Sequence, residues 1–151
     1  PLLQTTLLSA PPGVRISGKL SKNGVSLAMR HAQFLVLPSV CYEGFPLVIA
    51  EAFAHGLPVV CSRLGGMREI VEHGFTGLHF NPGDVHDLSV QCQWLFDHPE
   101  ECLKMSKHAR AEYLKHYTPE TNYKLLLDIY QTTIAQYRSS VLFADQPDPV
   151  E

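Results

Sequence analysis

The sequence predicts an α/β fold in which a parallel sheet has helical crossovers and is followed by C-terminal helices. Short apolar runs alternate with segments of helical periodicity between residues 14 and 80, and the rest of the chain has helical periodicity. Continuous apolar runs are typical of strands that a parallel sheet buries on both faces. Their alternation with helices indicates strands that run in the same direction with a helix between each pair.

The apolar runs and the segments between them set the order of the elements. Strands are expected at 14–18, 34–38, 58–62 and 76–80. Helices are expected between them, at about 25–31, 46–55 and 67–73. Gly56 follows the second of these helices and suits its C-terminal end, because glycine readily adopts the left-handed conformation found there.

Three further helices are expected after residue 80. Asp84 is suited to cap the first, whose apolar face carries Val85, Leu88, Cys92 and Leu95. The second starts at Pro99 and runs to about residue 116. Thr118 is suited to cap the third. The third helix has an apolar face at three-and-four spacing, which we expect to pack: Tyr123, Leu126, Leu127, Tyr130, Ile134 and Tyr137.

Length and composition fit one globular domain, expected over 1–137, with a flexible tail over 138–151. The 151 residues are 45% hydrophobic and 18% charged, with a net charge of −3. This charge argues against a binder of nucleic acid or of anionic membranes, which is usually strongly basic, but it leaves a local basic site for phosphate open. No run reaches the roughly 18 apolar residues of a membrane span.

The four cysteines predict reduced, mostly buried thiols in a cytoplasmic protein. Their spacing matches no zinc framework, and no metal site is expected. The first residues, "PLLQTTLLSAPPG", lack both the basic region of a signal peptide and an initiator methionine. We therefore expect the chain to be cut from something longer.

The loop at 39–45 follows the apolar run at 34–38, and ligands of open α/β sheets bind beyond the carboxyl ends of the strands. Gly44 lets the backbone approach a ligand closely. Pro46 suits a first helical turn, where its missing N–H is no loss. The helix dipole and the free amides at this helix start predict a cradle for a phosphate group. The amides are those of Gly44, Phe45, Leu47 and Val48.

Two glutamates accompany this helix start. Glu51 lies within the apolar stretch "PLVIAEAFA", so the helix is expected to be buried nearly all round. A lone buried carboxylate is costly unless it is hydrogen-bonded, and two sugar hydroxyls would supply such bonds. Glu43, at the mouth of the loop, would touch a group beyond the phosphates. The residues alone leave an equal alternative, in which Glu51 pairs internally with an arginine or an amide and Glu43 is a solvated loop acid.

The segment "LPSVCYEGFPLVIAEAFAHGLPVVCSRLGGMREIVEHGFTGLHFNPGD" resembles the donor-binding segment of family 4 glycosyltransferases, which have the GT-B fold. The matching parts come in order: "LPS" closes a strand, "EGFPLVIAE" carries both glutamates, "GLPVV" forms the next strand, and "GGMREIV" precedes "GFTGLHFNPGD". Weaker similarity extends from "VRISGKL" to "YTPETNYKLLLDIY". The resemblance implies a partial Rossmann-like C-terminal domain of a retaining GT-B transferase.

The resemblance also implies a role for each matched residue. Glu51 would bind the ribose hydroxyls of the donor, and Glu43, the candidate catalytic residue, would contact hydroxyls of the donor sugar. The donor would be a UDP-, GDP- or ADP-sugar that gives a hexose to a sugar, lipid or polysaccharide acceptor. No metal and no further cofactor would be needed, because the helix start and basic residues take the phosphate charge. The sugar and the diphosphate would lie against Gly44, Phe45, Pro46, Leu47 and Val48.

The loop "SRLGGMRE" follows the run at 58–62 and lies beside the same crevice. Gly65 and Gly66 are expected to line the donor site, with a plain turn as an equal alternative. Arg63 and Arg68 are candidates for phosphate contact, although a surface charge is the more frequent role of such residues.

The family pattern also predicts what the chain lacks. The first GT-B domain, with the acceptor site and much of the catalytic apparatus, is expected to be missing, and so are the first two strands of the second domain. In the strand order 3-2-1-4-5-6 the run at 14–18 would be strand three, and the run at 34–38 would be strand four with an unpaired apolar edge. We therefore expect no transferase activity from these 151 residues alone.

Two other functions stay open at this point. One is a non-enzymatic nucleotide-sugar-binding or scaffold module from a truncated gene product. Another is a different GT-B activity, such as sugar-nucleotide epimerisation, which the glutamate motif followed by "GLPVV" argues against. The parent protein is expected in the cytoplasm, with peripheral contact to the inner face of a membrane as an option.

Overall fold

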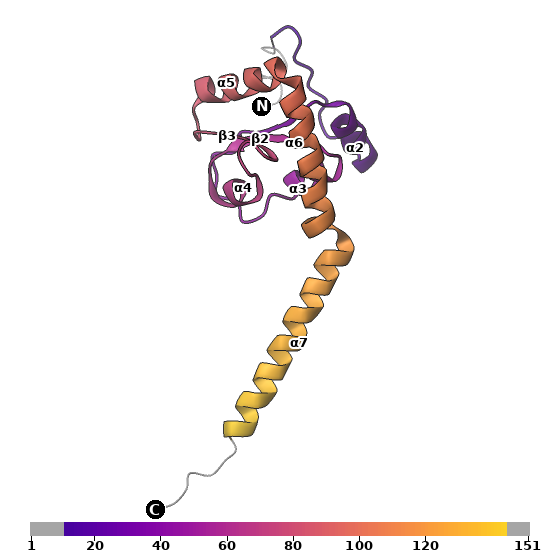
Figure 1. The fold of residues 1–151 in the computed structure, drawn as a ribbon, viewed down its shortest axis with the longest axis vertical. Helices are drawn as coiled ribbons and strands as arrows, with labels where there is room; N and C mark the ends of the chain where they lie inside the picture. The colour runs from indigo at the N-terminus through magenta and orange to yellow at the C-terminus, as the bar shows by residue number, and fades with distance from the viewer. Residues whose placement is uncertain (1–10, 145–151) are drawn as a thin grey trace, which may run out of the picture.

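The computed structural model describes residues 11–144 and has a parallel sheet at its centre (Figure 1). The three strands are β1 (Leu35–Leu37), β2 (Val59–Ser62) and β3 (Gly77–Phe80), in the order β1-β2-β3. Val36 lies opposite Val60, which lies opposite Leu78. The expected α/β architecture with parallel strands is thereby confirmed.

Helices connect the strands and continue after them. α2 (Lys22–His31) precedes β1, α3 (Leu47–Ala54) joins β1 to β2, and α4 (Gly65–Ile70) joins β2 to β3. The helices after the sheet are α5 (Val85–Asp97), α6 (Pro99–Glu112), the π-helical turn η1 (Tyr113–Tyr117) and α7 (Pro119–Ala144). The helix expected from Pro99 to about residue 116 is therefore α6 with η1.

The apolar core has two parts, one on each face of the sheet. On one face, Ile49 and Phe53 of α3 and Met67 of α4 pack against Val59 and Cys61 of β2. On the other face, Leu95 of α5 and Met105 of α6 pack against Val60, Leu78 and Phe80. The sheet is thus the middle layer of three. Every residue of β2 and β3 is buried, as the mostly apolar segments at 58–62 and 76–80 predicted.

Capping side chains fix where several helices begin. The Asp84 carboxylate accepts the N–H of Asp87 at 2.9 Å and caps α5, as expected. Thr118 Oγ1 accepts the N–H of Thr121 at 3.2 Å at the start of α7. Gly56 has a φ of +65°, which lets the chain turn sharply after α3.

The strand expected at 14–18 is not formed. These residues are mostly exposed and have no ladder partner within residues 11–144. A strand needs a neighbouring strand that hydrogen-bonds its N–H and C=O groups. The sequence of one segment does not determine whether such a neighbour is present.

β1 differs from its prediction in burial. Val36 is 36% exposed, and Leu35 and Leu37 are only half-buried. The reason is that, among the described residues, β1 pairs with β2 alone and forms an edge of the sheet. This edge is the one that the family pattern predicted.

α7 extends away from the rest of the molecule (Figure 1). The prediction that an apolar face of this helix packs is wrong for the described chain. The six side chains of that face are between 38% and 69% exposed. The helix also continues to Ala144, past the residue at which we expected a tail to begin. Residues 145–151 of that tail lie outside the described residues.

Within residues 11–144, no helix is both long and apolar enough to cross a membrane. The four cysteines are free thiols: Cys61 is buried, Cys92 and Cys102 are half-buried, and Cys41 is exposed. The expectation of mostly buried thiols therefore fails at Cys41, which lies in the loop after β1.

Candidate functional site

Two loops meet at the carboxyl edge of the sheet. One loop follows β1 and contains Glu43 and Gly44, and the other follows β2 and leads into α4. The N–H of Gly66 donates to the carbonyl oxygen of Glu43 at 2.9 Å, which joins the two loops. Parallel strands end at the same edge, so this junction lies where α/β folds place their ligands.

Glycine is required where these loops touch. A Cβ atom on Gly66 would lie 2.1 Å from the carbonyl oxygen of Gly44, and one on Gly65 would lie 3.1 Å from that of Glu43. Gly65 also has a φ of +49°. The two glycines thus hold the Glu43–Gly44 backbone in place, which is more than the plain turn that the sequence left open.

The start of α3 presents free amides at the same edge. The first bond of the helix runs from the N–H of Ile49 to the carbonyl of Pro46 at 3.0 Å. The amides of the expected cradle have no hydrogen-bond acceptor within residues 11–144: Gly44, Phe45, Leu47 and Val48. This arrangement favours an anion, because unpaired amides and the helix dipole both attract negative charge.

Apolar side chains flank the free amides. Leu47 is 70% exposed, whereas Pro46 is buried. The Phe45 ring is tilted against the ring of Tyr117 in η1, with 5.7 Å between their centroids. η1 therefore supports the loop after β1 from the side of the C-terminal helices.

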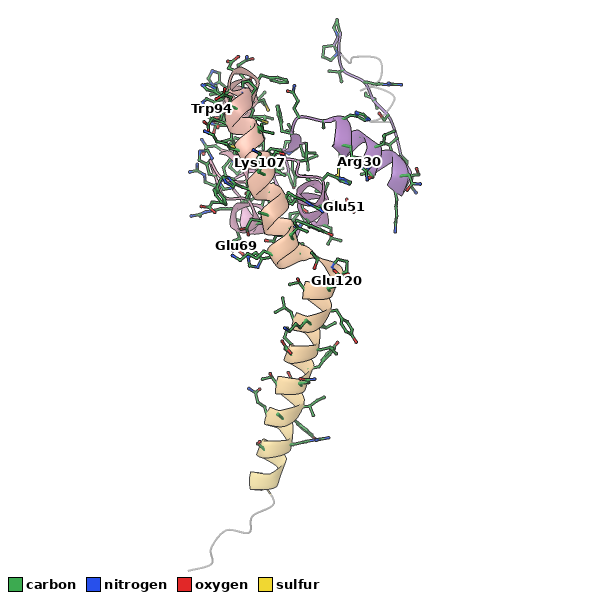
Figure 2. All side chains as sticks on the ribbon, turned by 45° about the vertical axis from the view of Figure 1, so that its right-hand side comes forward. Arg30, Glu51, Glu69, Trp94, Lys107 and Glu120 are labelled. Carbon is green, nitrogen blue, oxygen red and sulfur yellow. The ribbon has the colours of Figure 1, made fainter. Side chains whose placement is uncertain are left out.

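Glu51 is exposed, and the prediction that α3 is buried nearly all round is wrong. The helix buries Ile49, Ala52 and Phe53 on one face and leaves Glu51 on the other. The reason is the position of α2, which stands off from this part of α3 and leaves a pocket between the two helices (Figure 2).

This pocket has a volume of about 330 Å³ and a mixed lining. Its polar side chains are Glu51 and His55 from α3 and its C-terminal end, and Lys22 and Ser26 from α2. The Ser26 hydroxyl lies 3.2 Å from Nε2 of His55. The carboxylate of Glu51 has no hydrogen-bond or ion-pair partner among the described residues. It is therefore free to accept hydrogen bonds from a ligand in the pocket.

The sequence did not point to Lys22, Ser26 or His55. They come together with Glu51 only because α2 docks beside α3, and no local pattern specifies that packing. The internal partner that the sequence left open for Glu51 is absent within residues 11–144.

Glu43 is half-buried at the junction of the loops. Its backbone carbonyl is used by Gly66, while its carboxylate makes no hydrogen bond or ion pair with the described residues. The candidates for phosphate contact are exposed, with Arg63 on the second loop and Arg68 on α4.

His79, on β3, is a buried histidine that no motif in the sequence marked. Burial lowers its pKa to about 4, and the charges of His73, Arg63 and Arg68 act in the same direction. The backbone N–H of His79 donates to Nδ1 of His73 at 2.9 Å. At neutral pH the His79 ring is uncharged, so it adds no positive charge to this edge of the sheet.

Within residues 11–144, no group of three or more histidine, cysteine, aspartate or glutamate residues is placed to hold a metal ion. The groups that the described residues place at this edge are free amides, two unpaired carboxylates and exposed arginines. These groups suit a ligand with phosphate at one end and hydroxyls along its length.

Known families provide an independent comparison. The profile of the family described as "Glycosyl transferases group 1" matches residues 3–112. The chain belongs to this family.

One relative of this group 1 glycosyltransferase chain is the sulfoquinovosyl transferase SQD2 of Arabidopsis thaliana. It is 33% identical over 135 residues, which are 87% of this chain and 26% of the relative. The chain spans between 26% and 30% of the length of three curated relatives.

Solved structures of glycosyltransferases share its fold. Sucrose-phosphate synthase from Thermosynechococcus elongatus gives a TM-score of 0.78 at 27% identity, over 89% of this chain and 33% of the other. HepE of Anabaena in complex with UDP gives a TM-score of 0.67 at 25% identity, over 70% of this chain and 29% of the other. The group 1 glycosyltransferase chain thus has the Rossmann-like fold of a GT-B domain with its C-terminal helices.

Proposed function

We propose that this chain binds the nucleoside diphosphate sugar donor of a retaining family 4 glycosyltransferase. The observation that carries the proposal is the unpaired carboxylate of Glu51, which lines a pocket on the same helix whose free amides begin at Leu47. Group 1 membership and the likeness to a UDP-bound glycosyltransferase support it.

The spacing along α3 suits the parts of such a donor. The free amides of Leu47 and Val48 take the diphosphate, where the helix dipole adds about half a positive charge. Glu51 lies four residues beyond Leu47, which is about 6 Å along the helix axis. Its two oxygens accept the hydroxyls of ribose, and the base enters the pocket between α2 and α3.

Glu43 lies on the other side of the diphosphate and contacts hydroxyls of the donor sugar. In the transfer, the bond from the anomeric carbon to the diphosphate breaks and a bond to the acceptor oxygen forms on the same face. The proton of the acceptor hydroxyl goes to the departing diphosphate. The helix amides and the basic residues stabilise the charge that develops on the leaving group, so no metal is required.

The donor class in this proposal is a UDP-, GDP- or ADP-sugar, the transferred group is a hexose, and the acceptor is a carbohydrate or a lipid. The UDP bound by the neighbour HepE supports the nucleoside diphosphate and leaves the base open. We place the parent enzyme in the cytoplasm. The free thiols of all four cysteines are consistent with this location.

Glu51→Gln tests the ribose role in the full-length enzyme. The change removes the charge of the acceptor that the ribose hydroxyls use, so we expect the Kd for the preferred nucleoside diphosphate to rise about tenfold or more. Isothermal titration calorimetry with UDP, GDP and ADP measures this effect and identifies the base.

A deoxyribose probe makes the test specific. The wild type is expected to bind the 2′-deoxy nucleotide less tightly than the ribonucleotide, whereas Glu51→Gln binds both alike. Glu120→Gln, an exposed glutamate at the start of α7, is the matched control and keeps wild-type affinity. Equal discrimination by wild type and Glu51→Gln would refute the ribose contact.

A further inference from the structure

A second polar pocket lies at the opposite end of α3 from the free amides. It has a volume of about 570 Å³ and opens between α2, the end of α3 and α6. The side chains that matter here are Arg30, His55, Ser106, Lys107 and Arg110. We call it the α2–α3–α6 basic pocket. Figure 2 labels two of these lining residues, Arg30 on α2 and Lys107 on α6.

The wall made by α3 and α6 is tightly packed. A Cβ on Gly56 would lie 3.3 Å from the carbonyl oxygen of Ser106, so the end of α3 rests directly on α6. The Arg110 guanidinium donates to the carbonyl oxygen of Ala54 and lies 5.3 Å from the centroid of the Tyr113 ring. These contacts fix the guanidinium in place and leave its other N–H groups free to face the pocket.

The pocket carries positive charge that the described residues do not neutralise. Arg30 and Lys107 form no ion pair or hydrogen bond within residues 11–144, and no aspartate or glutamate lines the pocket. α2 and α3 both end nearby, and each helix end contributes about half a negative charge. The charges of Arg30, Lys107 and Arg110 together exceed these two contributions. The pocket that Glu51 lines adjoins this one, because Ala54 and His55 line both.

We propose that the α2–α3–α6 basic pocket binds a phosphate group distinct from the diphosphate of the donor. Arginine forks match phosphate oxygens in pairs, lysine adds a compact charge, and the Ser106 hydroxyl is a further donor. α3 has 8 residues, so the pocket lies about 12 Å from the free amides of the same helix. One phosphate group cannot reach both ends.

The phosphate comes either from a small soluble phosphate ester or from the headgroup of an anionic lipid. Both present the same charged oxygens to the pocket. The expected binding weakens with salt, because the cations of the pocket are exposed.

The test compares two double variants of the full chain. Arg30→Gln with Lys107→Gln removes the two unpaired cations of the pocket. Lys115→Gln with Lys124→Gln removes the same charge from two exposed lysines outside it. All four side chains are exposed, so both variants are expected to fold, and a thermal unfolding curve checks this.

Equilibrium dialysis with labelled inorganic phosphate, in the presence of excess UDP, forms the first arm. Sedimentation with phosphatidylcholine vesicles that do or do not contain phosphatidic acid forms the second. We expect the pocket variant to lose affinity about tenfold or more in at least one arm, and the control variant to keep it. The arm that shows the loss identifies the source of the phosphate.

Equal losses in the two double variants would overturn the proposal, because net charge would then explain the binding. So would an absence of wild-type binding in both arms. The outcome does not depend on the donor proposal, because Arg30 and Lys107 lie at the other end of α3 and neither variant changes Glu51.

Discussion

Position 66 leaves no room for any side chain. The carbonyl oxygen of Gly44 occupies the place where a Cβ would stand, and the N–H of Gly66 holds the carbonyl of Glu43. This single residue therefore sets how closely the loop after β2 approaches the loop that carries Glu43.

Gly66→Ala tests that role. An alanine inside a helix is normally about 1 kcal/mol more stable than a glycine, but here the 2.1 Å contact must be relieved by moving the Glu43–Gly44 loop. We expect the free energy of unfolding to fall by about 1–3 kcal/mol and the donor affinity to fall with it. Chemical denaturation and nucleotide titration measure the two effects.

Gly24→Ala is the matched control, because Gly24 lies inside α2 and an added Cβ would meet Leu20 at an ordinary 3.4 Å. Its stability is expected to stay the same or to rise. If both alanine variants behaved alike, the loop contact would have no special role.

At the scale of the element, the edge of the sheet is the exposed feature. β1 pairs with β2 alone among the described strands, and its middle residue, Val36, is 36% exposed. Such an edge offers unpaired N–H and C=O groups to other chains.

Val36→Lys is expected to reduce self-association of the 151-residue chain severalfold, because a lysine on an edge strand disfavours pairing between edges. Light scattering during concentration measures the change. Val90→Lys, on the 48% exposed Val90 of α5, places the same charge away from the edge and is expected to have little effect. If Val36→Lys and Val90→Lys reduced self-association equally, the added charge, rather than the edge of the sheet, would explain the effect.

The elements were predictable where their signals are local. The strands β2 and β3 lie in short, mostly apolar segments, and side-chain oxygens of Asp84 and Thr118 cap the starts of α5 and α7. The strand expected at 14–18 failed, because a strand exists only beside another strand. The prediction that Glu51 is buried failed for a similar reason. The residues around it are apolar, but the packing of α2 decides what covers them.

The candidate site was likewise predictable from the sequence only in part. The free amides of Leu47 and Val48 follow from Pro46 and the helix start, which the sequence contains. The contribution of Lys22, Ser26 and His55 to the pocket, and the whole basic pocket at the other end of α3, depend on how separate helices meet.

At the scale of the whole molecule, the chain is short beside its curated relatives. It spans between 26% and 30% of the length of three curated relatives, and the site that we propose on the described residues is for the donor alone. We expect the purified 151-residue chain to show no sugar transfer, because the site proposed on the described residues binds the donor and we identify no acceptor site on them.

The measurement is incubation with each of the three classes of donor sugar and a panel of sugar and lipid acceptors, followed by mass spectrometry of the products. Detected transfer would refute the expectation. A full-length parent that binds the donor but also fails to transfer would instead favour a non-enzymatic binding module.

The candidate donor site and the basic pocket lie at opposite ends of one helix, α3. Its first turn carries the amides that we propose for the diphosphate, and its last residues form a wall of the basic pocket. A ligand that moves or rigidifies α3 at one end changes the affinity of the site at the other end. Thermodynamic linkage makes this effect reciprocal. The factor by which a phosphate in the basic pocket changes donor affinity must equal the factor by which the donor changes the affinity for that phosphate.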